Sequence, residues 1–167
     1  MHTTAKLVKV VVAVIVVVVL TMLIVFKATQ DKTLLPDRVP SSIDENVIIT
    51  GEDEDKMEVP PNGGGASFNY GKEVLIDLAK GTADLYFENP GKAIYDASIF
   101  LVIDEQVILQ SGLLPPGSLL TSLTLPKKGV PLQKGEYDAE FWVQSYDENG
   151  EALSVNFQLQ GIRVEVK

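Results

Sequence analysis

Hydrophobic residues follow three successive patterns along the chain. A continuous apolar run, VVVAVIVVVVLTMLIVF, occupies residues 10–26 and contains no charge, proline or glycine. Residues 28–65 show few apolar positions and no period, and from residue 66 onward apolar and polar residues alternate in short segments. Alternation with a period of two is typical of half-buried β-strands. The patterning therefore predicts an apolar helix, a linker and a β domain, in that order.

The apolar run predicts a single membrane-spanning helix. Lys9 and Lys27 close it at its two ends, and a helix of about 20 residues at about 1.5 Å per residue spans one bilayer core. The main alternative is a cleaved signal peptide, whose cleavage site needs small residues. The run instead ends at the bulky Phe26 and the charged Lys27. We predict a short basic tail over residues 1–9 and an uncleaved anchor over residues 10–27.

The distribution of charge bears on the orientation of this anchor. Basic residues are balanced on the two sides of the run, so the positive-inside rule does not decide the orientation. The first 30 residues contain no Asp or Glu, and all 23 acidic residues follow the anchor. The short tail and this asymmetry favour a cell-membrane protein with a cytoplasmic amino terminus and an extracytoplasmic carboxy-terminal domain.

Residues 28–65 have the composition of a linker. They contain four prolines, the run Gly63-Gly64-Gly65 and the acidic run 52–55. Apart from Val47-Ile48-Ile49, apolar residues are too few to bury enough surface to offset the entropy of ordering. A flexible chain of this length separates its ends by roughly 35 Å. The expected tether therefore lifts the domain off the membrane but does not cross a thick cell wall.

Seven alternating segments predict the strands of the domain over residues 66–167. They cover 73–78, 82–87, 93–103, 106–111, 119–125, 136–146 and a last strand that includes Val155 and Val166. The third is apolar on both faces, which is typical of a central strand. Asn149-Gly150 predicts a hairpin turn with positive φ at both residues, and the change of phase after Leu159 predicts a β-bulge at or beside Gly161.

About seven strands at this spacing, with no amphipathic helix, predict an all-β fold, namely an immunoglobulin-like β-sandwich. An open Greek-key barrel is the alternative. Gly135-Glu136-Tyr137 leads into the strand 136–146 in the manner of a tyrosine corner, in which the phenol hydroxyl ties a loop to the sheet. The alternative for Tyr137 is a side chain that only packs.

Three segments carry a resemblance to a known group: LYFENPGKAIYDASIFLVID (85–104), LQSGLLPPGSLLTSLTL (109–125) and LQKGEYDAEFWVQSYDENG (132–150). They are similar to small Firmicutes membrane-anchored proteins with an extracellular Ig-like β-sandwich. The chain departs from that group between Asn89-Pro90 and Tyr95, where the usual second Asn is absent, and after Asn149-Gly150. The resemblance implies the anchor, linker and fold, and it implies no activity.

Composition excludes several kinds of chemistry. The chain has no cysteine, and its single histidine is His2, before the anchor. A Ser-His-Asp triad, a thiol nucleophile and a Cys/His metal site in the β domain are therefore excluded. Carboxylate pairs remain at Asp138 and Glu140 on one strand face and at Asp104-Glu105 in a turn, but such pairs need a cleft to act in catalysis. We expect no enzyme, no cofactor and, because the chain is acidic, no nucleic-acid partner.

Two features are candidates for binding a partner. Trp142 is predicted on the face opposite Phe141, beside Asp138 and Glu140, and an exposed Trp can anchor a protein or a glycan. The alternative is that Trp142 covers the second face of the sheet or packs under the linker. Leu113 and Leu114 begin a leucine-rich loop around Pro-Pro-Gly, which is either a hydrophobic tip for a partner or is buried between sheets.

The sequence thus predicts a non-enzymatic, membrane-anchored extracytoplasmic interaction module. Because the tether is short, we expect its partner to be an envelope protein near the membrane. The module would be an accessory or structural subunit of a bacterial envelope assembly of the secretion or conjugation type. The alternative is a surface adhesin or a glycan- or ligand-binding module. The sequence leaves the oligomeric state open.

Overall fold

The computed structural model describes residues 40–53, 55–58 and 66–167. These residues form an all-β unit, which confirms the predicted class, and in this part of the chain no helix is long and apolar enough to span a membrane. The predicted tail and anchor, residues 1–27, lie outside the described residues. The strands are β1 (Val47–Ile49), β2 (Asn69–Tyr70), β3 (Glu73–Asp77), β4 (Thr82–Asn89), β5 (Asp96–Ile103), β6 (Gln106–Gln110), β7 (Ser118–Thr124), β8 (Gly135–Tyr146) and β9 (Ala152–Val166).

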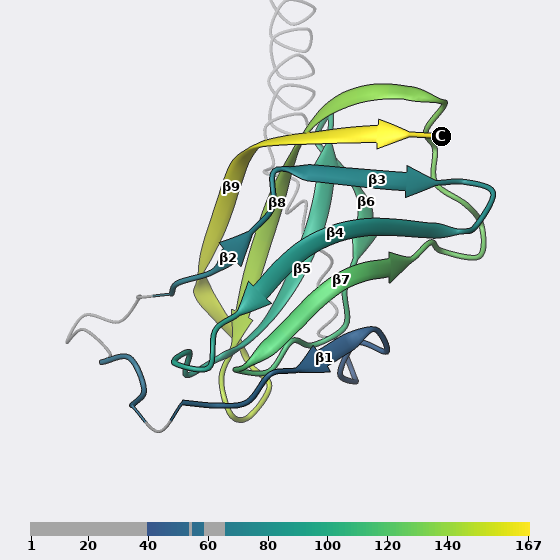
Figure 1. Cartoon of the computed structure of the whole chain (residues 1–167). Helices are drawn as coiled ribbons and strands as arrows, with labels where there is room; N and C mark the ends of the chain where they lie inside the picture. The colour runs from purple at the N-terminus through teal and green to yellow at the C-terminus, as the bar shows by residue number, and fades with distance from the viewer. Residues whose placement is uncertain (1–39, 54, 59–65) are drawn as a thin grey trace, which may run out of the picture. The chain divides into compact units, whose positions relative to one another are not determined.

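The seven predicted strands are all present as β3 to β9, and two short strands, β1 and β2, add to them. The nine strands form one mixed sheet in the order β1-β7-β4-β3-β9-β8-β5-β6, with β2 paired to β4. All pairings are antiparallel except that between β3 and the end of β9. Figure 1 shows the sheet curling, so that β4 and β7 lie in front of β5 and β8.

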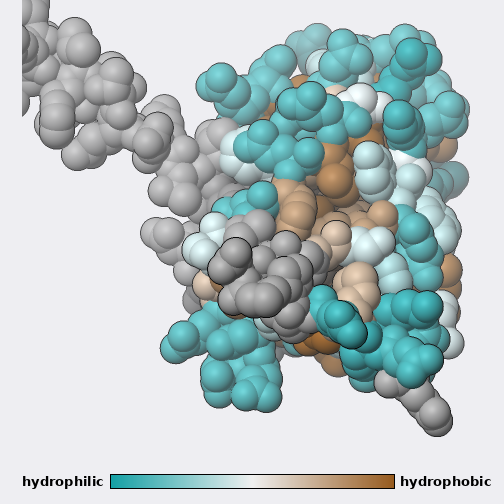
Figure 2. All heavy atoms as spheres, turned by 90° about the vertical axis from the view of Figure 1, so that its left-hand side faces the viewer, coloured by the Kyte–Doolittle hydropathy of each residue, from teal (hydrophilic) through white to brown (hydrophobic). Residues whose placement is uncertain are grey.

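The curl encloses one main core. Inward-facing side chains of β3, β4 and β7 and those of β5, β8 and β9 belong to the same buried cluster. Phe87 of β4 and Phe141 of β8 meet edge to face with ring centroids 6.3 Å apart. Phe68, just before β2, lies 5.4 Å from Phe87 and 5.5 Å from Phe157 of β9. On the side where β2 and β9 lie, hydrophobic residues reach the surface between hydrophilic ones (Figure 2).

The central position predicted for the third segment is confirmed, because β5 pairs with β6 on one side and β8 on the other. The bulge at Gly161 is also confirmed: Ala139 pairs with Ile162 and Phe141 with Leu159, so Glu140 alone faces two residues of β9. Gly161 has a φ of 77°, which suits a bulge glycine.

Of the two predictions about local geometry, one is confirmed and one is wrong. The hydroxyl of Tyr137 donates to the carbonyl oxygen of Gln133 at 2.9 Å, as a tyrosine corner requires. In the hairpin between β8 and β9, however, only Gly150 has positive φ. The carboxylate of Asp147 accepts hydrogen bonds from the N–H groups of Asn149 and Glu151, at 2.9 and 2.8 Å. These bonds close a turn with a single left-handed residue, and they lower the pKa of Asp147.

The linker expected over residues 28–65 requires a correction for its middle part. Residues 47–49 form β1 on the edge of β7. The N–H of Asp44 donates to the carbonyl oxygen of Leu113, and the N–H of Thr50 donates to that of Gly117. This segment lies so close to Gly112 and Gly117 that neither position has room for a Cβ atom. Order here comes from backbone hydrogen bonds to the domain, which hydrophobic periodicity does not reveal.

Candidate functional site

Trp142 lies on the outer face of the half of the sheet formed by β5, β8 and β9. Its direct neighbours across the strands are Phe100 on β5 and Gln158 on β9. The side chain is half-buried and packs against a small cluster formed by Phe100 and Val102, together with Val107. Trp142 therefore covers the second face of the sheet, as one of the predicted alternatives had it, and still keeps part of its surface open.

A hydrogen bond to the neighbouring carboxylate orients the indole ring. The Nε1–H of Trp142 donates to Oε2 of Glu140 at 2.8 Å. Both side chains project from the same face of β8, since they are two residues apart on one strand. The bond orients the indole and places the Glu140 carboxylate beside it.

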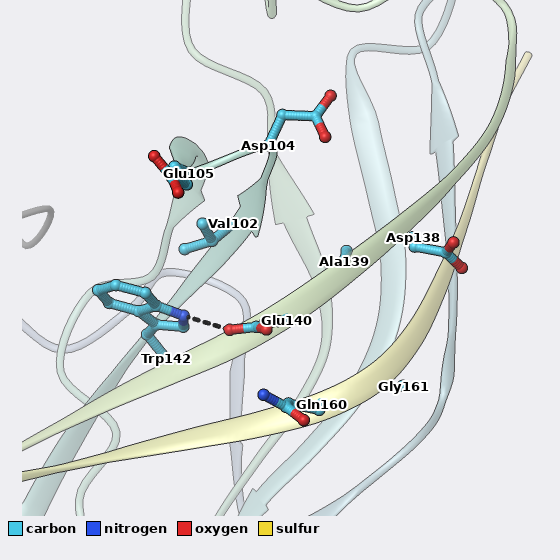
Figure 3. Close-up of a pocket in the computed structure, with 9 residues that line it drawn as sticks. All are labelled: Val102, Asp104, Glu105, Asp138, Ala139, Glu140, Trp142, Gln160 and Gly161. Atoms are coloured by element: carbon cyan, nitrogen blue, oxygen red, sulfur yellow. Dashed lines mark hydrogen bonds between the residues drawn. The ribbon is translucent and has the colours of Figure 1, made fainter.

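Beside Trp142 is a groove with a volume of about 490 Å³. Figure 3 shows Val102, Glu140 and Trp142 lying between the Asp104-Glu105 turn on one side and Gln160 of β9 on the other. The groove is lined by Val102, Asp104, Glu105, Asp138, Ala139, Glu140, Trp142, Gln160 and Gly161. Four of these nine residues are acidic and none is Lys, Arg or His. The groove therefore combines an indole, a small apolar base and a negatively charged rim.

The acidic turn at one end of the groove is strained. Asp104 and Glu105 have φ values of 48° and 60°, which lie in the left-handed region that residues other than glycine rarely adopt. They form the two-residue loop of the β5–β6 hairpin, in which Ile103 pairs with Gln106. Such a loop is usually made by Asn-Gly or Asp-Gly, so Asp104 suits its position, whereas the left-handed Glu105 costs about 1 kcal/mol or more. The chain thus keeps the Glu105 carboxylate on the rim at a cost in stability.

Two lining elements were not assigned to the site from sequence. Gln160 and Gly161 lie at the bulge of β9 and line the groove. The change of phase in the sequence predicted the bulge, but it did not indicate that the bulge lies beside Trp142. The turn at Asp104-Glu105 was recognised, but its proximity to Trp142 follows only from the pairing of β5 with β8.

The four carboxylates border the groove and are not arranged as a metal-ion site. Within the described ranges, no three Asp, Glu, His or Cys side chains are placed to hold a metal ion. What the groove can do is attract a cationic group electrostatically and offer the face of Trp142 to it.

The second predicted partner site does not form an exposed tip. Leu114 is fully buried in the core, and its backbone exchanges hydrogen bonds of 2.8 and 3.0 Å with Ala97 of β5. Leu113 is half-buried and bridges to Ile43 in the segment that precedes β1. The alternative of burial is the correct one for Leu114, because its side chain fills the core where the loop returns to β5.

A second hollow, of about 780 Å³, lies on the outer face of β3, β4 and β9. It is larger than the Trp142 groove, but it mixes Lys72 and Arg163 with several acidic residues. Its exposed aromatic residue is Tyr86, whose hydroxyl donates to Glu88 at 3.1 Å. That bond to a carboxylate raises the pKa of Tyr86. The lining of this hollow has both positively and negatively charged side chains, so the uniformly acidic Trp142 groove is the better defined site.

No protein-family model, curated protein or solved structure matches this chain.

Proposed function

We propose that this protein is a non-enzymatic, membrane-anchored module that displays an Ig-like domain outside the cell membrane and binds a basic segment of an envelope protein in the Trp142 groove. The observation that carries the proposal is the composition of the groove: a half-exposed indole and four carboxylates, with no basic residue in its lining. A lysine or arginine side chain complements both features, because its charge pairs with the rim and its alkyl stem or guanidinium packs on the indole.

The strand pairing supports the Ig-like part of the proposal. Of the seven longer strands, the first, second and fifth (β3, β4 and β7) pair with one another, and the third, fourth, sixth and seventh (β5, β6, β8 and β9) form the other group. Ig-type sandwiches likewise place the first, second and fifth strands opposite the third, sixth and seventh. The fourth strand, which joins the first group in a constant-type Ig domain, here pairs with the third. The hydrogen bond of Tyr137 to Gln133 is a further feature of such domains.

The sequence supports the location. The apolar run over residues 10–26 is long enough to span a bilayer, and 13 residues (27–39) separate it in sequence from the described segment at Pro40. A tether this short favours a partner close to the membrane, as in a secretion or conjugation assembly. It also disfavours an adhesin that must clear a cell wall.

Site-directed cross-linking on intact cells tests the proposal. The chain has no cysteine, so Gln160→Cys, labelled with a maleimide that carries a photoreactive group, reports only on what occupies the groove. We expect a discrete protein adduct. Asp138→Lys should weaken it at least tenfold, because reversing a rim charge opposes a basic partner. Added salt should weaken it as well, because the contact is electrostatic.

Asp84→Lys is the matched control, since Asp84 is an exposed acidic residue on the outer face of β4, away from the groove. Trp142→Ala should also abolish the adduct, with folding checked by circular dichroism because Trp142 packs on Phe100. Equal adducts in the Asp138 and Asp84 variants would refute an acidic docking groove. Binding that needs Trp142 but ignores Asp138 and salt would instead indicate a neutral glycan stacked on the indole.

A further inference from the structure

The segment of residues 40–57, the strap, runs along one edge of the sheet beside β7 (Figure 1). None of its described residues is buried, and among them only Val47 packs against the core cluster. Ile43, Ile48 and Ile49 are each more than half exposed. Hydrophobic burial therefore contributes little to holding the strap against the domain.

Hydrogen bonds hold the strap at three separate places. At its start, the carbonyl oxygen of Ser42 accepts a bond of 2.9 Å from the N–H of Leu113. In the middle, β1 pairs with β7 over its three residues. At its end, the N–H of Met57 donates to the carbonyl oxygen of Lys92 at 2.9 Å. Because these places are separated along the strap, a pull on its start breaks them one after another.

An acidic contact works against the docking of the strap. Burial, and secondly the charge of Glu52 in the strap, raise the pKa of Asp96, the first residue of β5. Two such carboxylates repel each other when both are ionised. Lys56 offsets part of this repulsion, because its Nζ donates to Glu52 at 2.8 Å and to the carbonyl oxygen of Gly91 at 2.9 Å. The strap is therefore docked by a few polar contacts against an opposing charge.

The rest of the sheet does not depend on the strap. β1 lies at one end of the strand order, so β7 keeps its pairing with β4 when β1 leaves. The buried residues of the core cluster all lie between Val74 and Val166. Segments with few buried apolar contacts open locally at a lower free energy than the whole fold. The strap can therefore open while the core stays folded.

We propose that the strap is a releasable extension of the tether, which peels from β7 under tension and lets the folded domain move away from the membrane. This inference rests on the proposed function, because the anchor is the fixed end and a partner bound in the Trp142 groove exerts the pull. In sequence, 13 residues (27–39) separate the apolar run from the strap. Release adds the 18 residues 40–57 to that length, which is about 60 Å of extended chain.

Single-molecule stretching tests the release in the full-length protein, held in a non-ionic detergent. The chain has no cysteine, so Gln30→Cys and Lys167→Cys place one pulling handle before the strap and one at the end of the domain. We expect two successive steps: a short one of at most about 60 Å as the strap peels, and a longer one at higher force as the core unfolds. A single step in which strap and core come apart together would overturn the proposal.

Gly117→Ala and Gly129→Ala are matched controls for the short step. Both glycines have a φ of 74°, but only a Cβ atom at position 117 would collide with the strap, at the backbone of Gly51. Gly117→Ala should therefore lose the short step and keep the long one, whereas Gly129→Ala should keep both. The same result in both variants would overturn the assignment of the short step to the strap.

Hydrogen exchange tests the local opening without an applied force. The amides of Thr50 and Met57 in the strap should exchange at least tenfold faster than that of the buried Ile99, and their exchange should depend little on low urea concentrations. Equal rates with the same dependence on urea would also overturn the proposal, because the strap would then open only when the whole domain unfolds.

Flotation with phosphatidylcholine vesicles separates this inference from the proposed function. A protein that floats with the vesicles but shows no short step would overturn the releasable strap and leave the anchor in place. A protein that shows the short step but does not float would refute the anchor and, with it, the role of the strap as part of a tether.

Discussion

The substitution Gly117→Ala should detach the segment that the sequence suggested was linker. Gly117 has a φ of 74°, and a Cβ atom added there would fall on the carbonyl oxygen of Gly51, well inside the 3.0 Å that real Cβ atoms keep. The clash is with backbone, so it cannot be relieved by moving a side chain. The segment around Thr50 must therefore shift away from β7.

The structure allows the cost to be worked out. The left-handed φ costs an alanine about 1 kcal/mol. The shift also breaks two hydrogen bonds that Thr50 donates to the carbonyl oxygen of Gly117, from its N–H at 2.7 Å and from its Oγ1 at 2.9 Å. Each such bond contributes about 1 kcal/mol. The free energy of unfolding should therefore fall by about 3 kcal/mol.

Gly129→Ala is the matched control, because Gly129 also has a φ of 74° but has no atom within 4 Å of an added Cβ. This substitution should lower the free energy of unfolding by about 1 kcal/mol, the cost of the left-handed φ alone. Both variants can be measured by urea unfolding, followed by the fluorescence of the only tryptophan, Trp142. Equal losses of stability would refute the reasoning, because they would mean that residues 50–53 do not lie against Gly117 in solution.

Two further predictions concern the acidic residues. Glu105→Gly should raise the free energy of unfolding by about 0.5–1 kcal/mol, because glycine adopts the left-handed φ without strain and loses part of that gain through its more flexible unfolded state; a loss of stability in urea unfolding would contradict the turn geometry. Burial, and secondly the charge of Glu52, raise the pKa of Asp96 above its ordinary value of 3.8. Because the folded state disfavours the ionised carboxylate, the free energy of unfolding falls as pH rises through the pKa of Asp96. Asp96→Asn should accordingly raise the melting temperature at pH 7 and leave it nearly unchanged near pH 3, and equal shifts at both pH values would exclude this cause.

Local pattern was sufficient for the strands of the domain. Alternation of apolar and polar residues located β3 to β9, because one face of each strand is buried and the side-chain period of a strand is two. The same logic located the bulge at Gly161, since a bulge is the only simple way to change that phase within one strand. Tyr137 was recognisable because its hydrogen bond partner, Gln133, is only four residues away.

Hydrogen bonds and close contacts that hydrophobic periodicity does not reveal explain the misses. Asn149-Gly150 favours a turn with two left-handed residues, but the carboxylate of Asp147 captures the N–H groups of Asn149 and Glu151 and selects another turn. β1 was missed because its order depends on glycines far along the chain that leave room for it.

The sequence by itself determined the class of the domain, its strands and the exclusion of cysteine and histidine chemistry, because composition and periodicity are properties of neighbouring residues. The tertiary structure alone decided what lies together. The pairing of β5 with β8 carries the acidic turn at Asp104-Glu105 to the side of Trp142, and the bulge adds Gln160. Whether a strand edge is free likewise depends on which segments reach it, and β3 reaches β9 only at its last residues.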